Sequence, residues 1–219
     1  MVTNKQPSVP LILGVPGGGL RRGQVHGSVG AVTAGAAGEE RTAAVLNRLA
    51  EQWGCTVLHD FMLPSAKYQA NVDHAIVSGN SVVLIDTKVW APGFYWGLSN
   101  CYRGLEKFPP ADKRTMSMAV TMLGGYLRSA GAVVNRTPII AIWPSNDSRQ
   151  LRTWAWRSPQ GYKPVHGDRL EKHLKAMGLR RPAAPAIVDA LSRLLVTPSA
   201  GPRRPARQND VIIDVDDWG

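Results

Sequence analysis

The order of helical and extended segments predicts an α/β fold, in which a mixed β-sheet is flanked by helices. Residues 71–77 and 82–88 are rich in Val and Ile and are joined by a short turn containing Gly79, which is typical of a β-hairpin. Residues 38–53 instead repeat apolar side chains at helical spacing. Of the 219 residues, 44% are hydrophobic, which is sufficient for the core of one domain with extensions.

We assign the domain to residues 35–197 and a flexible extension to each end. Residues 1–34 are rich in Gly, contain no acidic residue and are expected to form a mobile basic arm. Residues 198–219 begin with prolines and arginines and end in an acidic segment that also contains Ile and Trp. This acidic end could dock on a protein partner, fold back over the protein's own basic face, or only solubilise the chain.

Gly38–Trp53 is the first predicted helix, and a mainly apolar stripe runs along it. The stripe consists of Glu39, Ala43, Leu46, Ala50 and Trp53. Glu39 is therefore expected to face the interior, whereas Glu40 faces water. An acidic residue in the first turn can also serve only to complement the helix dipole. A strand over Cys55–Leu63 and a polar loop over Pro64–Ala70 follow.

The predicted hairpin carries three charged side chains on one face. If Gly79 and Asn80 are the central turn residues, Asp73 lies opposite Asp86, with Cβ atoms roughly 5 Å apart. Lys88 shares this face because side chains alternate along a strand. Two opposed carboxylates repel, and a hard cation such as Mg²⁺ removes the conflict. The alternatives are a solvated Asp86–Lys88 ion pair on an ordinary hairpin, and a one-residue slip, which would flip one strand.

Further elements follow the hairpin. Asp112–Ala130 is a predicted helix and Thr137–Trp143 a predicted buried strand. Residues 149–163 combine tryptophans with arginines, and form either a strand that faces nucleic acid or the solvated edge of a β-hairpin. Asp168–Met177 and Pro185–Leu195 are the last predicted helices.

The charge of the chain suggests a polyanionic partner. The formal net charge is +10, and residues 143–182 hold nine basic and three acidic residues, a net charge of +6. Nucleic acid is the first candidate, and a generically basic surface is the alternative. No apolar stretch of about 18 residues predicts a membrane span, and the start of the chain lacks the pattern of a signal peptide. Cys55 and Cys101 form neither a metal motif nor a disulfide framework, so we expect a reduced, cytoplasmic setting.

An Asp on one strand and Asp-x-Lys on its hairpin partner resemble the core of the PD-(D/E)xK nucleases. The surrounding residues are similar to the nuclease-related (NERD) domain of that superfamily, in the segments Gly38-Glu39, Val57-Leu58-His59-Asp60, Asn71-Val72-Asp73-His74 and Ile85-Asp86-Thr87-Lys88-Val89-Trp90. The resemblance is specific over about residues 35–90 and, over 113–197, rests mainly on the order of elements. It implies a restriction-endonuclease-like mixed sheet flanked by helices, and cleavage of DNA.

The leading function is metal-dependent hydrolysis of DNA phosphodiester bonds, with Mg²⁺ or Mn²⁺ as cofactor. Asp73 and Asp86 would hold the metal, with the carbonyl of Thr87 as a possible third ligand. Lys88 would assist the nucleophile. In the resembled family the glutamate that matches Glu39 lies beside the metal, where it would bind a second metal or orient water. A fourth polar position of that family's site has no clear match, and a non-catalytic module that binds nucleic acid or a protein partner is the alternative.

Six residues are candidate contacts to nucleic acid: Lys67, Tyr68, Trp90, Arg149, Arg152 and Arg157. Lys67 and Tyr68 lie on a loop that could equally be solvated. Trp90 and the aromatics at 94–96 could stack on unpaired bases or pack against the end of the sheet. His74 could support the site, act as a base, or be a packed histidine.

Overall fold

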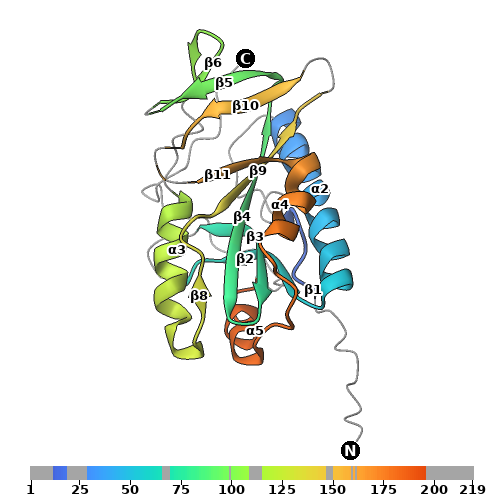
Figure 1. Cartoon of the computed structure of the whole chain (residues 1–219), viewed down its shortest axis with the longest axis vertical. Coiled ribbons are helices and arrows are strands. Elements are labelled where there is room, and N and C mark those ends of the chain that lie inside the picture. The colour runs from blue at the N-terminus through green and yellow to red at the C-terminus, as the bar shows by residue number, and fades with distance from the viewer. Residues whose placement is uncertain are drawn as a thin grey trace, which may run out of the picture.

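The computed structural model describes residues 12–18, 29–65, 70–98, 100–108, 115–146, 150–158, 160 and 162–195. Two sheets lie one above the other along the long axis, and helices cover both faces of the larger sheet (Figure 1). The predicted α/β class, with a mixed sheet flanked by helices, is confirmed.

Within the described residues, seven strands form the larger sheet, in the order β1-β2-β3-β4-β9-β11 with β8 paired to β4 outside this path. The pairs β2–β3 and β3–β4 are antiparallel, whereas β1–β2, β4–β9, β4–β8 and β9–β11 are parallel. The strands are β1 (Ile12–Leu13), β2 (Thr56–Met62), β3 (Asn71–Ser78), β4 (Ser81–Trp90), β8 (Val133–Val134), β9 (Ile139–Pro144) and β11 (Lys163–His166).

The hairpin β3–β4 has the predicted register. His74 pairs with Ile85 and Ser78 pairs with Ser81, so Gly79 and Asn80 are the two turn residues. Gly79 has a φ of 57°, which a glycine adopts without steric cost. The alternative of a one-residue slip is therefore wrong.

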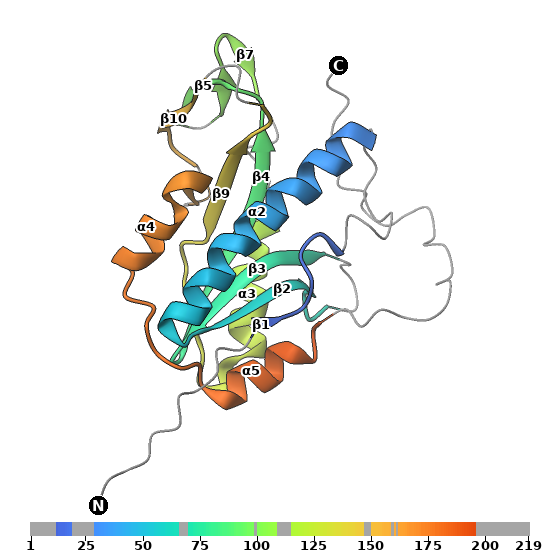
Figure 2. The same cartoon turned by 90° about the vertical axis from the view of Figure 1, so that its right-hand side faces the viewer.

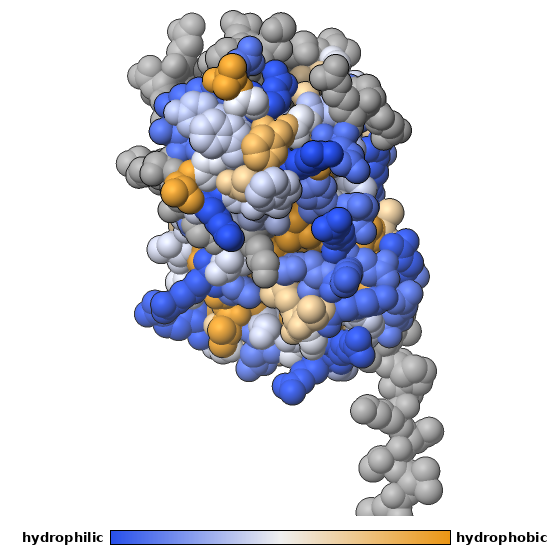
Figure 3. Space-filling view, turned by 45° about the horizontal axis from the view of Figure 1, so that its top comes forward, coloured by the Kyte–Doolittle hydropathy of each residue, from blue (hydrophilic) through white to orange (hydrophobic). Residues whose placement is uncertain are grey.

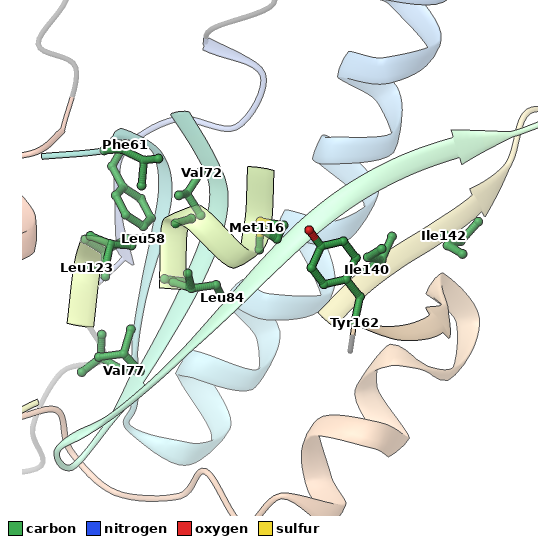
Figure 4. Close-up of a cluster of buried hydrophobic side chains, with 14 of the residues drawn as sticks. Leu58, Phe61, Val72, Val77, Leu84, Met116, Leu123, Ile140, Ile142 and Tyr162 are labelled. Atoms are coloured by element: carbon green, nitrogen blue, oxygen red, sulfur yellow. The ribbon is translucent and has the colours of Figure 1, made fainter. Parts of the chain in front are cut away.

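Helices enclose two clusters of buried side chains, one on each face of the larger sheet. Helices α2 (Val29–Trp53) and α4 (Leu170–Ala176) cover one face, as Figure 2 shows for the long diagonal α2. Helices α3 (Thr115–Tyr126) and α5 (Pro185–Ser192) cover the other, and Figure 4 shows side chains of α3 against those of the strands. The part of the chain that the structure describes also contains two short 3₁₀ helices, η2 (Arg128–Ala130) and η3 (Gly167–Arg169).

Helix α2 begins at Val29, so the predicted start at Gly38 is wrong. Strand β1 pairs with β2. Both the strand and the first turns of α2 fall within residues 1–34, where the sequence predicted a flexible arm. The parts of this range that the structure describes therefore contribute to the fold. The tail from 198 onward lies outside the described residues.

A smaller sheet lies beyond the end of β4, with the order β10-β5-β6-β7. Its strands are β5 (Gly93–Gly97), β6 (Tyr102–Arg103), β7 (Glu106–Lys107) and β10 (Leu151–Trp156). Strand β10 pairs with β5 in parallel, so this segment is an edge strand but not one arm of a hairpin. Among the described residues, no helix combines the length and apolarity needed to cross a bilayer.

Candidate active site

The candidate site lies where strands β3 and β4 separate. Their ladder ends at the pair His74–Ile85, which is next to Asp73 on β3 and next to Asp86 on β4. Beyond this point β4 pairs with β9, while β3 stays with β2. The backbone N–H of Thr87 donates to Oδ2 of Asp73 at 2.7 Å. Its hydrogen-bond acceptor is therefore a side-chain carboxylate and not a backbone carbonyl of a neighbouring strand. The opening brings the two aspartates to one place.

Lys88 binds the carboxylate of Asp86. Its Nζ donates to Oδ1 at 2.9 Å and lies 2.8 Å from Oδ2, and it also donates to the carbonyl of Thr87 at 3.3 Å. The side chain of Asp86 is only 17% exposed and that of Lys88 37%, so the ion pair is partly withdrawn from water. The interpretation as an ordinary solvated surface pair does not fit this burial.

Glu39 reaches the site because α2 lies unusually close to β4. A Cβ atom on Gly38 would lie 2.4 Å from Cγ2 of Val89, so only glycine permits this approach. One turn later, Oγ1 of Thr42 accepts hydrogen bonds from Oγ1 of Thr87 at 2.9 Å and from Nε1 of Trp143 at 2.8 Å. These contacts hold the helix at a defined height above the strand.

The carboxylate of Glu39 faces the interior, as the helical periodicity predicts. Glu39 is 7% exposed and accepts a hydrogen bond from the backbone N–H of Gly17 at 2.8 Å, whereas Glu40 is exposed. Because α2 begins at Val29, Glu39 is not in the first turn of the helix, and the interpretation of a first-turn acid that only complements the helix dipole is wrong.

Burial and mutual repulsion perturb the titration of these groups. Burial, with added repulsion from Asp60 and Asp86, raises the pKa of Glu39 to about 7. Burial and the nearby charges of Asp86 and Glu39 raise the pKa of Asp73 well above its usual value. Burial alone would lower the pKa of Lys88, but the surrounding carboxylates outweigh it and raise the pKa above the usual value. The carboxylates thus share a place where negative charge exceeds positive charge, which favours cations.

The donor set fits a hard divalent cation in part. Asp73, Asp86 and Glu39 supply carboxylate oxygens, and Mg²⁺ is held by one or two carboxylates together with water and substrate phosphate. In the part of the chain that the structure describes, no group of three or more His, Cys, Asp or Glu side chains converges into a complete ligand set. Both oxygens of Asp86 contact Lys88, so a cation at Asp86 would either share these oxygens with the ammonium or displace it.

Asp60 is a member of this cluster that the sequence reasoning did not select. It is 4% exposed, has a φ of 48° and accepts a hydrogen bond from Nδ2 of Asn71 at 2.8 Å. Its charge also raises the pKa of Glu39. The sequence signal that could have identified Asp60 is the presence of an Asp among the apolar residues of a predicted strand. Its left-handed backbone, which is costly for a residue other than glycine, is visible only in the structure.

His74 is a packed histidine, so its interpretation as an accessible base is wrong. Its ring is fully buried and lies edge-on to His59, with the two Nδ1 atoms 2.8 Å apart. Nε2 of His59 lies 2.8 Å from Oδ1 of Asn47 on α2. Burial lowers the pKa of both imidazoles, to about 4 for His59. The contacts of the two rings and Asn47 thus link β2 and β3 to α2.

The predicted nucleic-acid contacts have different positions in the structure. Trp90 is 4% exposed and packs against Tyr95, Phe108 and Trp156, so it offers no ring face to a base and its selection was wrong. Arg152 and Arg157 are exposed on and just after β10. The other three candidates, Lys67, Tyr68 and Arg149, lie outside the described residues.

Comparison with known proteins supports the resemblance. Residues 34–116 match the family model of NERD, the nuclease-related domain. The matched segment contains Glu39, Asp73, Asp86 and Lys88, and the resemblance recognised in the sequence is confirmed over this range. No curated protein and no solved structure matches the chain.

Proposed function

We propose that the protein is a Mg²⁺-dependent nuclease that hydrolyses DNA phosphodiester bonds. The observation that carries the proposal is the cluster at the fork of β3 and β4, where Lys88 binds Asp86 and the charges of Asp73, Asp86 and Glu39 all act on it and on one another. The match of residues 34–116 to a nuclease-related domain supports the same reaction class. The net charge of +10 is suited to a polyanionic substrate.

Each residue of the cluster has a chemical role in this proposal. Asp73 and Asp86 hold the cation, and the carbonyl of Thr87 is within the same group of donors. Bound Mg²⁺ supplies Lewis-acid chemistry to the scissile phosphate. Lys88 carries its proton at neutral pH, so it stabilises negative charge on the phosphate or orients the attacking water, but does not remove a proton from it. Glu39 orients water or holds a second cation.

A second candidate is a non-catalytic module that binds nucleic acid or a protein partner on the same fold. The incomplete ligand set among the described residues favours it, as does the double contact of Lys88 with Asp86. Opposed carboxylates have no use in a module that only binds polyanions, because they repel phosphate. We therefore place the nuclease first.

The deciding experiment compares the wild-type protein with Asp86→Asn, and with Glu51→Gln as a control on the exposed side of α2. Cleavage of single-stranded, duplex and branched DNA is measured with Mg²⁺ and Mn²⁺, and metal binding is measured by calorimetry. Asp86→Asn should abolish cleavage and weaken metal binding while DNA binding survives, because one negative charge near the phosphate is gone. Glu51→Gln should behave as the wild type.

A wild-type protein that binds neither cation and cuts no form of DNA would exclude the nuclease and leave the binding module. Lys88→Ala gives an independent check. It should stop cleavage and slightly weaken DNA binding, whereas Asp86→Asn should leave DNA binding intact.

A further inference from the structure

The outer side of the smaller sheet exposes aromatic rings to water. Phe94 is 38% exposed, Trp96 39% and Trp154 75%, and we call these three residues the aromatic face. Their neighbours Tyr95 and Trp156 point to the other side and are buried. Figure 3, which brings this end of the molecule toward the viewer, shows pale and orange side chains gathered among the blue ones. Three large rings on one side of a small sheet are not needed by the core beneath them.

The backbone holds these rings in place. The register of β10 against β5 shifts between Arg152 and Ala155, and this irregularity contains Trp154. The ring of Trp154 lies 5.4 Å from that of Phe94. Trp96 stacks on Tyr102 with ring centroids 4.9 Å apart. Its Nε1 donates a hydrogen bond to the carbonyl of Gly104 at 2.7 Å. Because these contacts order the rings in advance, a ligand that stacks on them loses little side-chain entropy.

The charge around the aromatic face is positive. Residues 93–108 and 150–158 hold four basic residues and one acidic residue, a net charge of +3. Arg152 pairs in register with Phe94 across the two strands, and Arg157 follows at the end of β10. Rings interleaved with arginines suit a ligand that presents both flat apolar faces and negative charge, and an unpaired nucleic-acid strand presents both.

The strand that carries the candidate site leads directly into the smaller sheet. Strand β4 carries Asp86 and Lys88, ends at Trp90 and is followed by β5 from Gly93. On the inner side, the ring of Trp90 packs against those of Tyr95 and Trp156, with ring centroids 4.8 Å and 5.4 Å apart, respectively. The buried aromatic contacts therefore join the smaller sheet firmly to the strand that bears the catalytic candidates.

We propose that the aromatic face binds single-stranded DNA by stacking Phe94, Trp96 and Trp154 on unpaired bases, with Arg152 on the phosphates. This inference rests on the proposed function and extends it, because it makes DNA with an unpaired segment the substrate. A duplex keeps its bases stacked on each other, so it can use the arginines but not the rings. The face thus distinguishes the two forms of DNA.

The test measures binding without cleavage. Fluorescence anisotropy in EDTA compares a labelled oligothymidylate with a duplex of the same length, so the result does not depend on whether the protein cuts DNA. The wild type should prefer the single strand. Trp154→Ala and Phe94→Ala should each weaken single-strand binding at least about fivefold, the low end of the stacking effect per base, and leave duplex binding nearly unchanged. Trp154→Phe should keep most of the affinity.

The control variant is Leu105→Ala, which removes a 97% exposed aliphatic side chain from the turn between β6 and β7 and should leave both affinities unchanged. Equal weakening of single-strand and duplex binding by Trp154→Ala, or no effect on either, would overturn the inference. So would self-association of the wild type that Trp154→Ala abolishes, because the face would then bind a second copy of the chain. Cleavage of duplex DNA without any single-strand preference would refute the inference and leave the proposed nuclease standing.

Discussion

Replacing Gly38 by alanine should push α2 away from β4 and disable the candidate site from a position outside the cluster itself. The added Cβ would lie 2.4 Å from Cγ2 of Val89 and 3.3 Å from Cγ2 of Thr87. Carbon atoms pack best at about 3.5–4.0 Å, so the helix or the strand has to move by about 1 Å. Val89 is β-branched and held in a strand, so it has few other rotamers to adopt.

Two opposing effects determine how Gly38→Ala changes the unfolding free energy. Overpacking of this kind destabilises by about 1–3 kcal/mol, whereas alanine in place of glycine within a helix stabilises by about 1 kcal/mol. The net loss is therefore about 0–2 kcal/mol. For a domain of this size that loss lowers the Tm by at most about 8 °C. The effect on activity should be larger, since a displacement of about 1 Å near the reacting groups can cost about 100-fold.

Gly124→Ala is the matched control, because an added Cβ in helix α3 would meet no atom within 4 Å. Thermal unfolding by circular dichroism should show this control to be as stable as the wild type or more so, and Gly38→Ala to be less stable than the control. Metal binding and DNA cleavage are measured on the same proteins. If Gly38→Ala gains stability like Gly124→Ala and keeps its activity, the close approach of α2 does not position Glu39.

Three further predictions concern individual side chains. Glu39→Gln should lower metal-dependent cleavage by about 100-fold or more, whereas Glu40→Gln should change it little; equal effects in a cleavage assay would contradict the placement of Glu39 at the site. Without metal, the folded state binds a proton at Glu39 more tightly than the unfolded state, because the pKa rises from 4.5 to about 7. This group therefore contributes stability below pH 4.5 that is lost as the pH rises to 7. Glu39→Gln should thus be more stable than the wild type at pH 8, by at most about 3 kcal/mol, and gain little at pH 5, as denaturant titrations at the two pH values would show. Trp90→Ala should cost about 3–5 kcal/mol of unfolding free energy, because the ring is buried among three aromatic side chains, and any change in DNA affinity should be accompanied by this loss of stability. A loss of DNA affinity without a loss of stability would show that this ring contacts the ligand after all.

Features that depend on local periodicity were predictable from the sequence. The register of the hairpin follows from a two-residue turn and a side-chain period of two, so Asp73 and Asp86 could be assigned to one place. The inward position of Glu39 and the outward position of Glu40 follow in the same way from the helical period. Both patterns are set by neighbours a few residues away, which the sequence displays directly.

The start of α2 was not predictable from such patterns. Residues 29–37 are mostly small and carry no strong apolar stripe, and their four alanines, which favour a helix, are offset by two glycines, two valines and a threonine. The helix nevertheless continues through them. Propensity is a weak guide where tertiary contacts stabilise an element.

The tertiary structure alone decided which of the remaining residues belong to the site and which to the core. Asp60 joins the carboxylates, and Trp90 is withdrawn from the surface. Strand β10 pairs in parallel with β5, which lies far from it in the sequence. The register irregularity in this pairing, between Arg152 and Ala155, leaves Trp154 exposed and Trp156 buried, although residues two apart on a regular strand share a face. Side-chain burial at these positions depends on contacts between distant segments, and a period read along the chain contains no information about which segments meet.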